Sequence, residues 1–287
     1  MLETIIDFSR YSSVKIGAPL KVSVLENDNE ISQEHQIIGL ANNLLIAPSA
    51  KNLALLGKNY DYICDKGECI EIGGAANSSK IFNYFRANDL GGLEFLGQLP
   101  GTLGALVKMN AGMKEFEIKN VLESACVNNQ LGALVKMNAG MKEFEIKNVL
   151  ESACVNNQWL GSEALGLDYR SSKFSGVVLK ARFKKTHGFR EEVLKACKSM
   201  RKSHPKLPNF GSCFKNPPND YAGRLLESVG LRGYRLKRVG FAKEHANFLV
   251  NLGGAEFEEA LELIELAKTR VLQEYGIHLE EEVKILR

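Results

Sequence analysis

The sequence predicts a protein of the α+β class with two domains. Segments that alternate apolar and polar residues, as strands do, are mixed along the chain with segments of helical periodicity. No GxGxxG run follows the first expected strand, so the chain lacks the fingerprint of a Rossmann dinucleotide-binding fold. With 287 residues, the chain is long enough for two domains and a substantial core.

The first part of the chain is expected to contain both kinds of element. Alternation predicts strands at residues 14–25, 52–57 and 70–73. The segment 79–88 has helical spacing, which places Ile81, Tyr84 and Phe85 on one side of a helix.

The second part continues this mixture. We expect a buried strand at 176–183, a helix at 190–202 that leads into the second domain, and a final strand around Val283 and Ile285. A long amphipathic helix is predicted at 256–275, with one apolar stripe formed by Phe257, Leu261, Ile264, Val271 and Tyr275. Gly276 follows this helix as a stop signal.

The composition excludes several classes of protein. Charged residues make up 25% and apolar residues 45%, which is ordinary for a globular protein, and a net charge of +3 does not indicate a nucleic-acid partner. No basic segment precedes a long apolar run at the N-terminus, and no run approaches about 18 apolar residues. We therefore expect a cytoplasmic protein without a signal peptide, a membrane span or a nucleic-acid partner.

Six cysteines are spread along the chain without a CxxC pair: Cys64, Cys69, Cys126, Cys154, Cys197 and Cys213. This usage is typical of a reducing compartment and does not indicate a disulfide framework or a zinc site. The five histidines are scattered as well, so no metal is expected.

Residues 103–130 and 131–158 carry the same sequence without one difference. Two copies do not make a solenoid, which needs three or more units. The identity indicates either a very recent duplication or an assembly error. Overpacking a core costs roughly 1–3 kcal/mol, whereas lengthening a loop costs about 0.6 kcal/mol per doubling. We therefore expect one copy to be expelled, with 109–112 in the fold and a loop from about 113 to about 147. Residues 149–158 of the second copy are then expected to lead into the strand of Arg170.

The densest group of reactive side chains lies at residues 211–217, Gly-Ser-Cys-Phe-Lys-Asn-Pro. Gly211 permits backbone angles closed to other residues, and the closing proline biases Asn216 toward extended geometry. In a strand, Ser212, Phe214 and Asn216 would share one face. The pattern fits a serine that donates a proton beside groups that bind an anion, and it also fits a turn followed by an edge strand.

Further motifs stand in a fixed order along the chain. They are GLEFL at 92–96, LPGTLGA at 99–105, MNAG at 109–112, YRSSKF at 169–174, NDYAGRLLE at 219–227, HANFLVN at 245–251 and LEEEV at 279–283. Together with residues 211–217, this order resembles the family of UDP-N-acetylenolpyruvoylglucosamine reductases (MurB). The resemblance covers nearly the whole chain.

The resemblance implies a particular arrangement within the α+β class. Residues 1–186 are expected to form a two-part FAD-binding domain of the PCMH/VAO type, with sub-parts at about 1–67 and 68–186. The repeated segments lie in the second sub-part. Residues 187–287 are expected to form a smaller α+β substrate-binding domain.

The resemblance also implies non-covalent FAD as the bound cofactor and NADPH as the reductant. Turns rich in glycine suit a diphosphate, because the main chain can approach the anion closely. The expected cofactor-binding residues are Gly57, Lys58, Asn59, Gly73, Gly74, Pro100, Gly101, Thr102, Gly104, Asn110, Ala111 and Gly112. Lys58 stands where the family usually has serine.

The family's reaction adds a hydride to the enolpyruvyl double bond of a UDP-sugar. The resemblance implies that Ser212 protonates the carbanion, that Arg170 faces the substrate carboxylate, and that Glu282 assists Arg170 or the enolate. The expected substrate-binding residues are Lys206, Asn216 and Asn247. The short interval between Arg170 and Ser212 indicates that the extra substrate loop of the longer subtype is missing.

Two other functions stay open at this stage. One is a flavin-binding protein that the duplication inactivates or misfolds, and the other is a flavin oxidase of the same broad fold. For the leading interpretation we expect a monomer that binds a UDP-sugar substrate. The absorption spectrum of the purified protein separates flavoproteins from the remaining possibilities.

Overall fold

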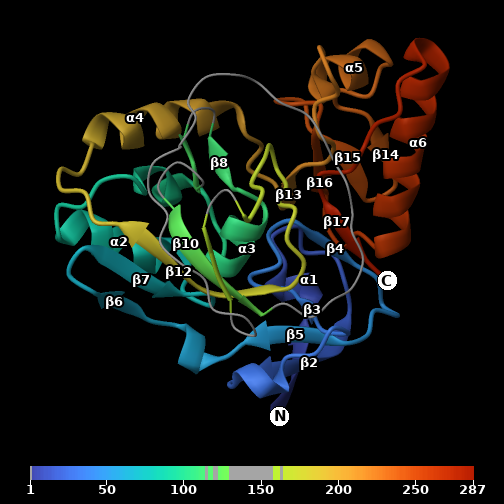
Figure 1. Cartoon of the computed structure of the whole chain (residues 1–287). Coiled ribbons are helices and arrows are strands. Elements are labelled where there is room, and N and C mark those ends of the chain that lie inside the picture. Colours follow the sequence, from blue (N-terminus) through green and yellow to red (C-terminus); the bar gives the residue numbers. More distant parts are fainter. Residues whose placement is uncertain (1, 114–115, 119–121, 129–157, 162–163) are drawn as a thin grey trace. The chain divides into compact units, whose positions relative to one another are not determined.

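The computed structural model describes residues 2–113, 116–118, 122–128, 158–161 and 164–287. The chain divides into two compact units. Unit 1 comprises residues 1–2, 23–39 and 54–201, and unit 2 comprises residues 3–22, 40–53 and 202–287. Both units mix helices and strands (Figure 1), which agrees with the α+β class expected from the sequence.

The main sheet of unit 1 is antiparallel, with strand order β11–β10–β12–β7–β6 (Figure 1). Its strands are β6 (Ile63–Asp65), β7 (Cys69–Gly73), β10 (Leu122–Asn128), β11 (Gln158–Gly161) and β12 (Val177–Lys184). The sheet shares an apolar core with the helices α2 (Ser78–Ala87), α3 (Leu103–Lys108) and α4 (Glu191–Met200). This core fixes the loops that carry the glycine-rich motifs.

Unit 1 also contains a small parallel ladder. Residues 23–25 of β2 (Pro19–Leu25) pair with residues 54–56 of β5 (Leu53–Leu56), and β3 (Gln36–Ile37) lies on the other side of β5. Short 3₁₀ turns follow these strands: η1 (Asp28–Glu30), η2 (Lys58–Tyr60) and η3 (Glu94–Gln98). The strands β8 (Gly112–Met113) and β9 (Phe116–Glu117) form an antiparallel pair.

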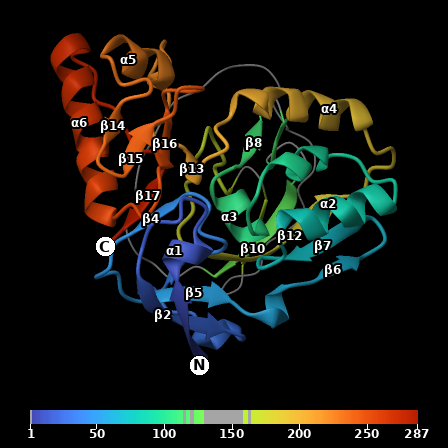
Figure 2. The same cartoon turned by 180° about the vertical axis from the view of Figure 1, so that it is seen from behind.

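Unit 2 is built on an antiparallel sheet with strand order β13–β16–β15–β14 (Figure 2). Its strands are β13 (Asn209–Ser212), β14 (Arg235–Leu236), β15 (Val239–Phe241) and β16 (Phe248–Asn251). A separate parallel pair joins β4 (Leu44–Ile46) to β17 (Lys284–Leu286). The remaining elements are β1 (Leu2–Asp7), α1 (Phe8–Tyr11), η5 (Arg201–Ser203), α5 (Ala222–Ser228) and α6 (Phe257–Tyr275).

Helix α6 confirms the amphipathic segment predicted at 256–275. Phe257, Ile264 and Val271 of the expected stripe are buried in the core of unit 2, whereas Tyr275 at the last turn is 39% exposed. The helix ends at Gly276, whose φ of 66° is in the left-handed region that glycine adopts without strain.

The first expected strand is shorter than the sequence pattern suggested. It begins at Pro19 and not at residue 14. Gly17, with φ of 135°, turns the chain so closely past Phe8 that a Cβ at Gly17 would lie 2.6 Å from the Cβ of Phe8. Val14 and Ile16 are buried because they fill the core of unit 2, and not because they belong to a strand.

The first of the two identical copies forms the described elements. It supplies α3, β8, β9 and the whole of β10, which lies inside the main sheet between β11 and β12. Our expectation that the loop begins near residue 113 and that the second copy supplies this strand was therefore wrong. Because the first copy follows Thr102 directly, it can form these elements by short connections. Residues 131–157 of the second copy lie outside the described residues.

The described part of the chain shows neither a membrane-spanning helix nor a cluster of metal ligands. None of its helices has both the length and the apolar character that crossing a membrane requires. No group of three or more histidine, cysteine, aspartate or glutamate side chains in that part is arranged to hold a metal ion.

Candidate active site

The glycine-rich segments expected to bind the cofactor meet in unit 1. Gly104 N–H donates to the carbonyl of Gly74 at 2.9 Å, and Leu103 N–H donates to the carbonyl of Ala76 at 2.8 Å. Asn77 and Thr102 form an isolated bridge between the same segments. The turn after β7 and the start of α3 are therefore joined directly by backbone hydrogen bonds.

Three of these glycines allow close approach of the main chain. A Cβ at Gly73 would lie 2.0 Å from the carbonyl oxygen of Tyr60, and a Cβ at Gly74 would lie 2.3 Å from that of Val178. A Cβ at Gly104 would lie 3.0 Å from the same Val178 oxygen. Larger residues would push the turns away from the sheet, so the glycines are required by backbone packing.

Arg170 lies at the tip of a tight turn beside the end of α3. Asp168 and Ser171 exchange backbone hydrogen bonds across this turn, and Arg170 has a φ of 50°. The guanidinium NH2 donates to the carbonyl of Gly112 at 2.9 Å, and the Asn110 amide donates to the carbonyl of Asp168 at 3.1 Å. The structure thus brings the expected residues Asn110, Gly112 and Arg170 together. A left-handed non-glycine residue is strained, which is common at functional sites.

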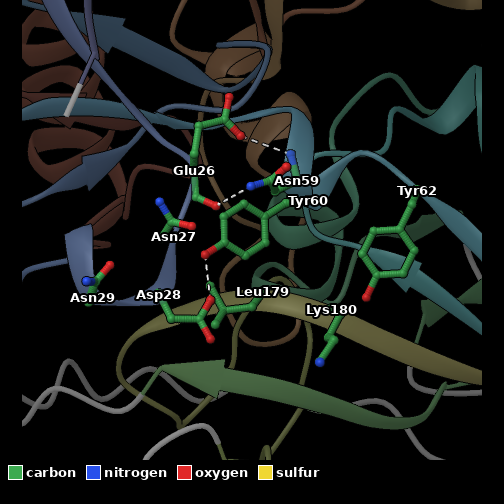
Figure 3. Close-up of a pocket in the computed structure, with 9 residues that line it drawn as sticks. All are labelled: Glu26, Asn27, Asp28, Asn29, Asn59, Tyr60, Tyr62, Leu179 and Lys180. Carbon is green, nitrogen blue, oxygen red and sulfur yellow. Dashed lines mark hydrogen bonds between the residues drawn. The ribbon is translucent and has the colours of Figure 1, made fainter.

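The turn at residues 57–59 already holds an anion. The N–H of Lys58 donates to one carboxylate oxygen of Glu26 at 3.1 Å. The N–H of Asn59 donates to the other at 3.0 Å, and the Asn59 side-chain amide donates to the Glu26 carbonyl (Figure 3). A Cβ at Gly57 would lie 2.3 Å from Cδ of Glu26. The geometry of this turn therefore suits a carboxylate or a phosphate oxygen.

A cavity of about 520 Å³ opens beside this turn (Figure 3). It is lined by Glu26, Asn27, Asp28, Asn29, Asn59, Tyr60, Tyr62, Leu179 and Lys180. The hydroxyl of Tyr60 donates to Asp28, and burial together with this carboxylate raises the pKa of Tyr60 far above its usual value. Tyr60 therefore remains a neutral hydrogen-bond donor at physiological pH.

In unit 2 the backbone ties Ser212 to the segment of Glu282. Ser212 is the last residue of β13 and is partly exposed, and its hydroxyl makes no hydrogen bond to the described residues. The next residue, Cys213, is fully buried, and its carbonyl accepts the N–H groups of Glu282 and Val283 at 2.9 and 3.3 Å. The backbone that follows Ser212 is therefore hydrogen-bonded to the backbone at Glu282 and Val283.

The alternation expected for residues 211–217 ends early. Cys213 and Phe214 are both fully buried, so the segment leaves strand geometry after Ser212. Burial, with the nearby charges of Glu281 and Glu282, raises the pKa of the Cys213 thiol well above its usual value. This thiol is therefore not a candidate nucleophile.

The three expected substrate-binding residues have different surroundings. Lys206 is exposed on the loop before β13. Asn216 is partly exposed, and its side-chain oxygen accepts the N–H of Ala222 at the start of α5. Asn247 is 3% exposed, and its amide makes two hydrogen bonds to the backbone of Phe214.

Sequence reasoning did not single out Glu26 or Asp168. The Glu26 carboxylate accepts the backbone N–H of Lys58, and the Asp168 carbonyl accepts the side-chain amide of Asn110. Both partners are far away in the sequence, so no local motif marks these two residues. Glu94, inside the GLEFL motif, is fully buried and accepts hydrogen bonds from Arg190. In the sequence, Glu94 is marked only by its position directly before the apolar residues Phe95 and Leu96.

The residues present fit a flavin dinucleotide in two respects. The Lys58–Asn59 turn binds an anion through main-chain N–H groups, as a diphosphate needs. The hydroxyl oxygen of Ser172, in the motif of Arg170, is buried without a hydrogen-bond partner among the described residues. An orphaned hydroxyl of this kind is expected where a ligand supplies the missing partner.

The fold and these sites define the class of an α+β enzyme with an anion-holding turn in one unit and, in the other, a serine whose following residue is hydrogen-bonded to the Glu282 backbone. Comparisons with known proteins make the class more specific. Residues 203–286 match the family model described as the C-terminal domain of UDP-N-acetylenolpyruvoylglucosamine reductase. The UDP-N-acetylenolpyruvoylglucosamine reductase of Helicobacter pylori (strain ATCC 700392 / 26695) is 84% identical over 287 residues, with both chains covered completely.

More distant relatives agree. The same reductase of Campylobacter jejuni (strain RM1221) is 39% identical, covering 98% of this chain and 100% of its own. The crystal structure of the reductase (MurB) from Thermus caldophilus has a TM-score of 0.79 at 27% identity, covering 100% of both chains. The chain belongs to the UDP-N-acetylenolpyruvoylglucosamine reductases and is an oxidoreductase.

Proposed function

We propose that this chain uses NADPH and FAD to reduce the enolpyruvyl group of UDP-N-acetylglucosamine enolpyruvate, which gives UDP-N-acetylmuramate for peptidoglycan synthesis. The observation that carries the proposal is the 84% identity to the Helicobacter pylori reductase over the full length of both chains. The FAD is non-covalent, within residues 1–186 in an arrangement of the PCMH/VAO type, and residues 187–287 form the substrate-binding domain.

The cofactor residues are those whose turns meet in unit 1. The N–H groups of Lys58 and Asn59 bind the diphosphate after the Glu26 carboxylate withdraws, and the Lys58 side chain adds positive charge. The turns at 73–74 and 100–104 and the segment 110–112 form the wall against which the cofactor packs. When bound, FAD takes a hydride from NADPH and supplies it to the substrate.

The protein's own groups manage the charge that this hydride creates. Addition at one alkene carbon leaves a carbanion delocalised into the adjacent carboxylate. The Arg170 guanidinium binds this carboxylate, because its planar fork matches carboxylate geometry. Ser212, whose hydroxyl is available for a ligand, donates a proton to the carbanion, and Glu282 assists this charge balance.

Lys206 and Asn216 bind the diphosphate or sugar of the substrate, and Asn247 belongs to the same site through its hydrogen bonds to the backbone of Phe214. The chain has the form of the short subtype, without the extra substrate loop between Arg170 and Ser212. The second copy of the repeat is an insertion into that form. We propose that the protein is a cytoplasmic monomer without a membrane or nucleic-acid partner.

The purified protein tests this proposal directly. It is expected to be yellow, to release flavin on acid precipitation, and to oxidise NADPH over many turnovers only when UDP-N-acetylglucosamine enolpyruvate is present. A colourless protein that cannot be reconstituted with FAD contradicts the flavin assignment. Flavin reduction without turnover of this substrate identifies another flavin oxidoreductase of the same fold.

A further inference from the structure

We propose that Asn247 is a positioning residue for Ser212, and that its side-chain amide holds the serine strand without contacting substrate. The inference rests on the proposed function, in which Ser212 donates a proton, and it changes the role of Asn247 within that function. The observations that carry it all lie in unit 2.

The amide of Asn247 replaces one unit of a β-ladder. Strand pairing between β13 and β16 ends at Ser212 and Phe248. Beyond that point, the Asn247 side-chain oxygen accepts the N–H of Phe214 at 2.9 Å, and its side-chain nitrogen donates to the carbonyl of Phe214 at 2.7 Å. The two bonds have the donor and acceptor pattern of a backbone peptide, so they extend the sheet where the strand itself has ended.

The same residue also holds Cys213. Its backbone carbonyl accepts the N–H of Cys213 at 2.7 Å. On the opposite side, the Cys213 carbonyl accepts the N–H groups of Glu282 and Val283. Every backbone polar group of Cys213 and Phe214 thus has a partner, and Asn247 supplies three of the five hydrogen bonds.

Burial argues against a direct contact between Asn247 and substrate. Asn247 is 3% exposed. Its side-chain oxygen accepts the N–H of Phe214, and its side-chain nitrogen donates to the carbonyl of Phe214. Withdrawing the amide for a ligand would leave the buried N–H and the buried carbonyl of Phe214 unpaired, which is unfavourable for both groups. Ser212 lies two residues before Phe214, so the direction of its hydroxyl depends on the two hydrogen bonds between the Asn247 amide and the Phe214 backbone.

The test is a single-turnover measurement on the FAD-loaded enzyme. Reduced enzyme is mixed with increasing UDP-N-acetylglucosamine enolpyruvate, and flavin reoxidation gives a limiting rate and a half-saturating concentration. For Asn247→Ala we expect the limiting rate to fall by about 10- to 100-fold, because a misplacement near 1 Å is sufficient for such a loss. The half-saturating concentration and the rate of flavin reduction by NADPH are expected to stay within about twofold of wild type.

Asn251→Ala is the matched control. Asn251, the last residue of β16, is buried as Asn247 is, and its side-chain amide also binds backbone, donating to the carbonyls of Val14 and Lys15 at 3.1 and 2.9 Å. Both variants are expected to lose stability, and only Asn247→Ala is expected to slow reoxidation. Equal slowing by both variants would show a general loss of structure and overturn the inference.

A double variant separates positioning from substrate contact. If Asn247 acts through Ser212, adding Asn247→Ala to Ser212→Ala slows reoxidation no further. An additive loss, or a raised half-saturating concentration with an unchanged limiting rate, would overturn the inference in favour of substrate contact. If Ser212→Ala itself leaves reoxidation unchanged, the failure lies in the proposed function, and a slow Asn247→Ala variant then contradicts positioning through Ser212.

Discussion

At the scale of single residues, the most informative side chain is Ser212. A free serine is a weak acid, and here the hydroxyl stands at the end of a strand whose next two residues have all their backbone groups paired. This rigidity allows one oxygen atom to be held at a fixed place. Preorganisation of this kind is what a proton donor of poor acidity needs.

Ser212→Ala is expected to leave flavin reduction by NADPH unchanged and to slow the second half-reaction by about 10²–10⁴-fold, the usual contribution of a general acid. Stopped-flow absorbance separates the two half-reactions. Cys213→Ala is the control, because this thiol is fully buried in the apolar core and is expected to affect stability more than rate. Equal slowing of both half-reactions by Ser212→Ala would show that Ser212 shapes the site.

The sequence identified this serine, but it could not identify what holds it. Residues 211–217 stand out locally, because a hydroxyl, an amine and an amide occur within one short segment. The hydrogen bonds from Asn247 to Phe214 depend on how β16 pairs with β13 across more than thirty intervening residues. Strand register of this kind is a property of the folded sheet, and single-sequence patterns do not contain it.

At the scale of elements, a buried carboxylate joins η3 to the start of α4. Glu94 is fully buried and accepts hydrogen bonds from the backbone N–H groups of Gly92 and Arg190 and from the Arg190 guanidinium. Burial raises the pKa of Glu94, but the hydrogen bonds from Arg190 outweigh it, so the pKa lies below the usual carboxyl value. The ionised form is therefore the one that stabilises this junction.

Glu94→Gln is expected to reduce the free energy of unfolding at neutral pH by about 1.5–3 kcal/mol, as for other hydrogen bonds to charged groups. The folded-state pKa is lowered, so this stability is present above the ordinary carboxyl pKa and is lost as the pH falls through the folded pKa. Urea denaturation from neutral to acidic pH measures the effect. The difference from wild type is expected to shrink toward acid, and a constant difference would contradict the linkage.

The same scale shows which elements a sequence predicts well. Helices α2, α4 and α6 were expected within a few residues of their bounds, because their apolar residues recur with helical spacing. Strands β13 and β16 are short, and they pair with each other across more than thirty intervening residues. Their sequences therefore carry only a weak strand pattern. At Val14 and Ile16 the sequence predicted a strand that is absent, because these two residues alternate with polar ones through core contacts and not through strand geometry.

At the scale of the whole molecule, the position of the repeat in the main sheet is the decisive feature. Val127 of β10 pairs with Gln158 of β11, and Cys126 pairs with Trp159. The chain between these strands, residues 128–157, contains nearly the whole second copy. The second copy is therefore inserted between β10 and β11, and both strands keep their pairing.

Deleting residues 131–158 joins Gln130 to Trp159 and restores the same pairing with a much shorter connection. Gln130 takes the place of Gln158 opposite Val127, which leaves Asn128 and Asn129 as a two-residue hairpin loop. Asparagine tolerates the positive φ that the favoured two-residue turns require. Shortening the loop by roughly four doublings is worth about 2 kcal/mol of closure free energy.

We therefore expect the shortened protein to fold, to retain FAD and to unfold at higher urea concentration than the full chain. Equilibrium urea denaturation of the two proteins at equal FAD saturation measures the difference, because bound ligand itself stabilises the folded state. The hairpin is checked within the shortened chain: Asn129→Gly suits the type I′ turn and is expected to stabilise it further, whereas Asn128→Val is expected to destabilise it. A shortened protein that is less stable, or that no longer binds flavin, would show that the second copy contributes to the fold.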